Sequence, residues 1–214
     1  DRGRVTCAQG DPRPRGGSRR RTPAASRGAL GRDIAATATL RQARGVPDLT
    51  RAGHTRGVRI FLPATAATLR RLPGAPIEAR VAFAATPELA RVLAGEDDEA
   101  VEFSAFLAAA DTSVELLAEA QAAGELVAAR RVVVTAELAP SSVRRDGTHG
   151  HPGAVVVPPV AWQDVAAIHV DEAEAAPDVQ SAAGGDPGAL ERLAERDLLW
   201  YDPSELDRLV TQLD

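Results

Sequence analysis

The chain of 214 residues contains no lysine and no methionine, and its only cysteine is Cys7. A single cysteine excludes a disulfide within the chain, which is typical of proteins from a reducing compartment, so we expect a cytoplasmic location. No apolar run approaches the ~20 residues that a membrane-spanning helix needs, and we therefore expect no membrane partner.

Aromatic residues are absent from residues 1–57, and all seven of them lie after Val58. Residues 1–57 contain thirteen Arg against four Asp, a net charge of +9, whereas residues 58–214 contain 12 Arg against 26 Asp and Glu, a net charge of −14. A segment with so few bulky apolar residues cannot bury enough surface to offset the entropy of folding. We predict a disordered Arg-rich segment over residues 1–57 and one acidic domain over residues 58–214.

The abundance of Arg and Ala without Lys indicates a GC-rich coding sequence, in which Val can be the residue encoded by a GTG start codon. We hypothesise that Val58 is the natural first residue and that residues 1–57 are upstream sequence, not part of the natural protein. The alternative is a native basic tail that binds the phosphates of nucleic acid. That tail lacks the aromatic residues on which single-stranded bases stack, and the acidic domain would repel nucleic acid, so we expect no such partner.

The apolar pattern after Val58 predicts a fold of strands and helices without strict alternation. Strands are predicted at residues 58–62, ended by Pro63, and at 77–83, 131–138 and 165–170, with 198–201 as a strand or a buried turn. Helices are predicted from Thr65, Thr86, Glu96, Asp186 and Asp202. In the long helix that ends near Gly124, we expect a core-facing stripe of Phe103, Phe106, Ala110, Val114, Leu117 and Gln121. The pattern predicts an α+β fold, with one mixed or antiparallel sheet and helices packed on one face.

Several short motifs lie in order along this part of the chain. They are Arg59–Thr65, Ala84–Leu89, Asp97–Glu99 followed by the helix that carries Phe103, Arg131–Val134, Val165–Asp171 and Leu198–Tyr201. In these motifs the chain from Val58 to its C-terminus resembles an uncharacterised family of small proteins from high-GC Gram-positive bacteria, a domain of unknown function. In that family the protein begins at the residue that matches Val58. The resemblance implies a domain boundary and no mechanism.

Two histidine motifs are candidates for chemistry. On a strand, His169 and Asp171 would point to the same face, where the carboxylate could orient the imidazole as a general base; the alternative is a strand end exposed to water. His149 and His151 have a spacing that could share a metal ion, but we favour the alternative of a Gly- and Pro-rich loop exposed to water. The acidic residues of 96–99 together with Glu102 could bind a hard cation, but the start of a helix explains them without a metal.

Trp200 and Tyr201 are candidates for a contact with a partner, because Trp and Tyr are enriched at the energetic centres of interfaces; the alternative is that they fill the core. No phosphate-binding loop, dinucleotide fingerprint or Cys-x-x-Cys motif follows Val58, so we expect no cofactor and no metal.

No motif names a reaction, and the function stays unknown. We favour an interaction or regulatory protein without catalytic activity that binds a protein partner or forms a homo-oligomer. The alternative is a small enzyme or ligand-binding protein with a pocket near His169 and Asp171. The second alternative is nucleic-acid binding through the Arg-rich segment.

Overall fold

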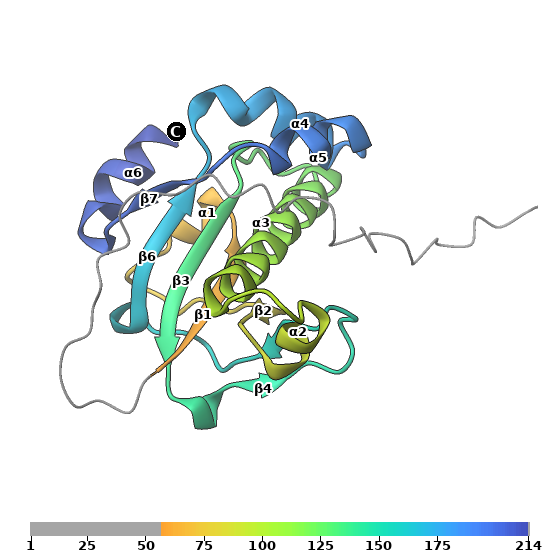
Figure 1. The fold of residues 1–214 in the computed structure, drawn as a ribbon. Helices are drawn as coiled ribbons and strands as arrows, with labels where there is room; N and C mark the ends of the chain where they lie inside the picture. The colour runs from red at the N-terminus through yellow and green to blue at the C-terminus, as the bar shows by residue number, and fades with distance from the viewer. Residues whose placement is uncertain (1–56, 214) are drawn as a thin grey trace, which may run out of the picture. The chain divides into compact units, whose positions relative to one another are not determined.

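The computed structural model describes residues 57–213 of the chain (Figure 1). The predicted disordered segment lies outside the described residues, apart from Gly57. The strands are β1 (Val58–Ala64), β2 (Ala82–Phe83), β3 (Val132–Leu138), β4 (Arg144–Arg145), β5 (Ala154–Val156), β6 (Val165–Val170) and β7 (Leu199–Tyr201). The helices are α1 (Ala66–Leu69), α2 (Pro87–Val92), α3 (Asp98–Ala122), α4 (Ala176–Ala183), α5 (Pro187–Ala194) and α6 (Leu206–Gln212). Short 3₁₀ turns lie at Pro140–Ser142, Trp162–Asp164, Ala173–Ala175 and Pro203–Glu205.

One antiparallel sheet organises the described residues, with the strand order β4-β5-β2-β1-β3-β6-β7. Its central pair, β1 and β3, keeps an unbroken register from Val58↔Leu138 to Ala64↔Val132. The next strand, β6, pairs with β3 across a β-bulge at Thr135 and Ala136. The prediction of an α+β fold with a single sheet is confirmed.

Helices cover both faces of the sheet, so the prediction of helices on one face is wrong. In β1, Ile60 and Leu62 pack on the side of α1 and α6, whereas Phe61 packs on the side of α2 and α3 (Figure 1). The central strands are apolar at consecutive positions, as in Val132–Val134, and a strand of that kind needs cover on both faces. The alternating residues 77–83 predicted a strand with one apolar face. Only Ala82–Phe83 of that segment forms a strand, and it lies next to β1 and not at the centre of the sheet.

Helix α3 begins at Asp98, shortly after the predicted start at Glu96, ends near Gly124 as predicted, and buries a different face. Asp97 caps its N-terminus by accepting a hydrogen bond from the Ala100 backbone N–H at 2.9 Å, and Gly124, with φ of 77°, follows its C-terminus. The buried side chains are mostly small: Val101, Ala105, Ala109, Ala110, Thr112, Ser113, Val114 and Leu117. Phe103 is 53% exposed, so the predicted stripe is wrong at that position. Small side chains let the helix lie close to the sheet, which leaves Phe103 and Phe106 at its flank.

Two predicted strands differ in length from the observed ones. β1 continues through Pro63 to Ala64, since β3 pairs with it along its whole length while β2 pairs with it only at Phe61↔Phe83. A proline N lacks a hydrogen, and it fits where the neighbouring strand is short. The predicted strand at 77–83 is reduced to Ala82–Phe83, preceded by an isolated bridge between Ile77 and Val160. No helix in the described part of the chain is long and apolar enough to cross a membrane.

Ser113 joins α3 to the end of the central strand pair. Its buried hydroxyl donates a hydrogen bond to the Ala64 carbonyl O at 2.8 Å and accepts one from the Val132 backbone N–H at 2.9 Å. Ala64 and Val132 are register partners, so one side chain satisfies both strands where the ladder ends. A hydrophobic side chain of similar size would leave both backbone groups buried without a partner.

We predict that Ser113→Ala lowers the free energy of unfolding by about 1–3 kcal/mol, the cost of unsatisfied buried polar groups. The measurement is urea unfolding, monitored by circular dichroism. Ser104→Ala is the control on the same helix, because Ser104 is partly exposed. Equal effects of the two substitutions would contradict the role given to Ser113.

Candidate functional site

Two of the predicted site residues, His169 and Trp200, lie side by side on the sheet. They are directly opposed register partners on β6 and β7, and such partners point to the same face. β7 is the last strand of the sheet, and Trp200 is 57% exposed. The face that they share is the one on which α3 lies (Figure 1).

Two phenylalanines of α3 extend this pair into a continuous surface. The Phe106 ring lies 4.9 Å from the His169 ring, edge to face, and 6.1 Å from the Phe103 ring, in a stacked arrangement. Phe61 of β1 supports Phe106 from below, at 5.6 Å between ring centroids. We call Phe103, Phe106, His169 and Trp200 the aromatic surface. The sequence pattern assigned both phenylalanines to the core. The only indication in the sequence that they are exposed is the width of the apolar stripe on this helix, which is more than one helix face can bury.

The His169 imidazole is held in a neutral form. Its Nε2 atom lies 3.1 Å from the Thr135 hydroxyl, in hydrogen-bonding contact. Burial lowers the pKa of His169 to about 4, and the nearby Arg59 guanidinium lowers it further in the same direction. Arg59 itself forms ion pairs with Glu102 at 3.3 Å and Glu137 at 3.7 Å. The imidazole therefore serves as a flat, uncharged component of the aromatic surface near pH 7.

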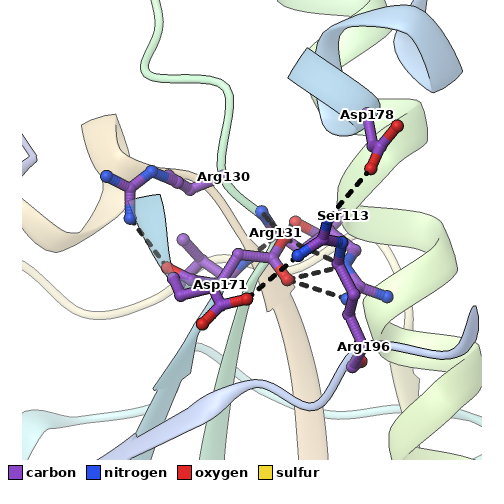
Figure 2. Close-up of polar contacts among 8 residues, drawn as sticks. Ser113, Arg130, Arg131, Asp171, Asp178 and Arg196 are labelled. Atoms are coloured by element: carbon purple, nitrogen blue, oxygen red, sulfur yellow. Dashed lines mark hydrogen bonds and ion pairs between the residues drawn. The ribbon is translucent and has the colours of Figure 1, made fainter. Parts of the chain in front are cut away.

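Asp171 is held by Arg131 and does not orient His169. The Arg131 guanidinium donates to both carboxylate oxygens, at distances of 2.7–3.1 Å, and the Arg131 backbone N–H donates at 2.8 Å (Figure 2). Both side chains are almost fully buried. His169 and Asp171 are close in sequence but do not form the predicted dyad. The carboxylate is bonded to Arg131, and the imidazole is bonded to Thr135.

The ion pair continues into a wider network at the same end of the sheet. Arg131 also donates to the Arg196 carbonyl O at 3.2 Å, and Arg130 donates to the Asp171 carbonyl O at 2.8 Å (Figure 2). The Arg196 guanidinium contacts Glu172 at 3.0 Å and Asp178 at 3.4 Å. These contacts tie the end of β6 to α4 and to the segment that leads into β7.

Tyr201 lies on the opposite face of β7 from Trp200, because successive strand residues alternate. It packs against the core beneath α6 and lines a pocket of about 410 Å³. The pocket is lined by Arg130, Val170, Asp171, Glu172, Ala173, Glu174, Leu199, Tyr201, Leu209, Gln212 and Leu213. The four predicted site residues are therefore divided between the aromatic surface, a buried ion pair and this pocket.

His149 and His151 both pack edge-on against Phe83, at 5.3 Å between ring centroids. His151 Nδ1 accepts a hydrogen bond from the Gly153 backbone N–H at 3.0 Å, and burial lowers the pKa of His151. Within residues 57–213, no three His, Cys, Asp or Glu side chains gather as a metal site would require. The two histidines of this loop therefore have a packing role against Phe83.

Comparison with known proteins gives a family and no activity. The family model of a family of unknown function, DUF6912, matches residues 58–210. No curated protein and no solved structure matches the chain.

We predict that Asp171→Ala lowers the free energy of unfolding by about 3–5 kcal/mol, because it leaves the Arg131 guanidinium buried and unpaired. The paired substitution Arg131→Met with Asp171→Leu is expected to restore most of that loss, since it removes both charges. Chemical denaturation measures both. Glu119→Ala, which breaks the exposed ion pair with Arg80, is the control, and a loss as large as that of Asp171→Ala would contradict the assignment.

We predict a pH dependence of stability that belongs to His169. The pKa of His169 is about 4 in the folded protein and about 6.5 when unfolded, so the unfolded state binds a proton that the folded state does not. The free energy of unfolding should therefore fall as pH drops from about 6.5 to about 4, by up to about 3 kcal/mol. Urea titrations at several pH values should show a shallower fall in His169→Gln than in the wild type. Ser104→Ala, which removes no titratable group, is the control and should keep the wild-type slope.

Proposed function

We propose, for a chain that belongs to the DUF6912 family of unknown function, that it is an acidic cytoplasmic interaction or regulatory protein that binds a protein partner through the aromatic surface and has no catalytic activity. The observation that carries this proposal is the exposure of Trp200 and Phe103, at 57% and 53%, on one continuous surface. Large aromatic side chains grouped on a surface are typical of interaction sites.

The rigidity of the aromatic surface supports this proposal. His169 is fixed by Thr135 on one side and by Phe106 on the other, and Phe106 rests on Phe61. The backbone of Trp200 is fixed by strand pairing with His169. A surface that is ordered before binding loses less entropy when a partner arrives, so its apolar area contributes more to affinity. The neutral imidazole avoids a charge that a partner would have to desolvate.

The charge of the domain favours a basic partner. Residues 58–214 contain 12 Arg against 26 Asp and Glu. An excess of one sign steers a partner of the opposite sign and speeds the encounter.

A ligand-binding function near His169 and Asp171 is the second candidate, and the pocket of about 410 Å³ beside Asp171 favours it. Its walls combine apolar side chains with Arg130, Glu172 and Glu174, a mixture that is typical of small-molecule sites. The carboxylate of Asp171 is bonded to Arg131, so the proposed ligand would contact other groups of the wall. Nucleic-acid binding rests on residues 1–57, outside the described residues.

We predict that Trp200→Ser and Phe103→Ser each abolish capture of a partner that the wild-type chain captures from lysate of its native cells. The expected loss follows from removing the largest exposed apolar side chains of the surface. The measurement is affinity capture with quantitative mass spectrometry, using the full chain, after circular dichroism has shown that each variant is folded.

The control is Val92→Ser, which removes an equally exposed apolar side chain, at 58%, from α2. Proteins captured equally by all four chains are background. If no protein depends on Trp200 and Phe103 and a small molecule instead co-purifies with the wild type, the interaction proposal is wrong and the pocket is favoured.

A further inference from the structure

The two edges of the sheet differ in the side chains that they expose. The edge strand β4 consists of Arg144 and Arg145, both exposed, and charged residues of this kind discourage pairing with another strand. The other edge strand, β7, consists of Leu199, Trp200 and Tyr201. No described strand pairs with its outer side. An apolar edge without charged side chains is open to pairing with a further strand.

Apolar surface lies beside β7 on both faces of the sheet. On one face, Trp200 continues into the aromatic surface. On the other face, Leu199 is 46% exposed and lies with Tyr201 in the wall of the pocket of about 410 Å³. The side chains of an added strand would alternate between the two faces, so one row would contact Trp200 and the other would enter the pocket. A single extended segment would thus contact the aromatic surface on one face and fill the pocket on the other.

Carboxylates surround the ends of β7. Asp197 and Asp202 flank it in the chain, and Glu174 lies in the wall of the pocket. Of the cations at this end, Arg131 is paired with Asp171 and Arg196 with Glu172 and Asp178. Arg130 donates to the neutral Asp171 carbonyl O and keeps its charge, but the carboxylates outnumber it. The charge around the edge is therefore complementary to Lys or Arg at the two ends of an added segment.

A second copy of the chain fits this edge less well. Antiparallel self-pairing of β7 centred on Trp200 would place Trp200 opposite its own copy and Asp202 of one copy opposite Leu198 of the other, one residue from Asp197. Two carboxylates would then lie near each end of the pair, and their mutual repulsion disfavours it. A basic segment of another protein relieves the negative charge that self-pairing would double.

We propose that β7 accepts an extended segment of a partner protein as an added strand, with apolar side chains at alternate positions and basic residues at both ends. Backbone hydrogen bonds would supply affinity, and the contacts with Trp200 and the pocket would supply specificity. This inference rests on the proposed function and specifies its partner and its mode of binding.

The test is selection of displayed random peptides of about ten residues, enough for one strand, on the full chain, with counter-selection on Trp200→Ser. The expected result is enrichment of peptides with alternating apolar residues between Lys or Arg. The enriched peptide should slow amide hydrogen exchange within Leu199–Tyr201. Exchange within Arg144–Arg145, at the opposite edge, should not change. Methylating the amide nitrogens on the pairing side of the peptide, or replacing its basic residues by Glu, should each weaken binding by about tenfold or more.

Three outcomes would overturn the inference. They are no enrichment over Trp200→Ser, an enriched peptide that binds equally well when N-methylated, and a wild-type dimer in light scattering that Trp200→Ser converts to a monomer. The last would assign the edge to a second copy. A cellular partner that still depends on Phe103 and Trp200, together with any of the first two outcomes, would retain the proposed function and reject strand addition.

Discussion

The position of β7, and with it the candidate site, depends on the buried ion pair between Arg131 and Asp171. Asp171 follows β6 directly, Arg131 precedes β3, and Arg131 also holds the Arg196 carbonyl O just before β7. A buried ion pair contributes little net stability when compared with apolar side chains of the same size, because both charges lose their hydration. We interpret its role as specificity: a slip of one residue between β3 and β6 would turn one partner to the opposite face, and the remaining charge would be buried alone.

A second constraint is the small-residue face of α3. Ala105, Ala109 and the hydroxyl of Ser113 bring the helix close to β1 and β3, where Ser113 closes the ladder. A helix at that distance covers the middle of the sheet and leaves β6 and β7 beside it (Figure 1). Phe103 and Phe106 then project from the helix flank over this open part. The packing that completes the core therefore also produces the aromatic surface.

The elements that could be predicted from the sequence are those specified by local chemistry. Thr86 caps α2 as predicted, the acidic run that starts at Glu96 supplies the cap of α3, and the apolar run at 131–138 forms β3. The exposure of Phe103 could not be predicted, because helical periodicity identifies only an apolar stripe along the helix. Which side of that stripe is buried depends on where the sheet lies against the helix. The partner of Asp171 was missed for a similar reason: Arg131 lies forty residues earlier, and pairing of β3 with β6 brings the two together. The adjacency of His169 and Trp200 likewise arises from strand pairing.

The residues that make the β7 edge apolar would also make the proposed strand addition specific. Trp200 stands on the side of a neutral imidazole, and Leu199 stands over a pocket whose wall carries Glu174, so the two faces of β7 differ in polarity. An incoming strand with the wrong phase would place its apolar row against Glu174 and its polar row against Trp200. It would lose apolar contact on one face and leave a carboxylate desolvated on the other. Because strand residues alternate strictly, a shift of one residue would reverse every contact of the proposed added strand at once.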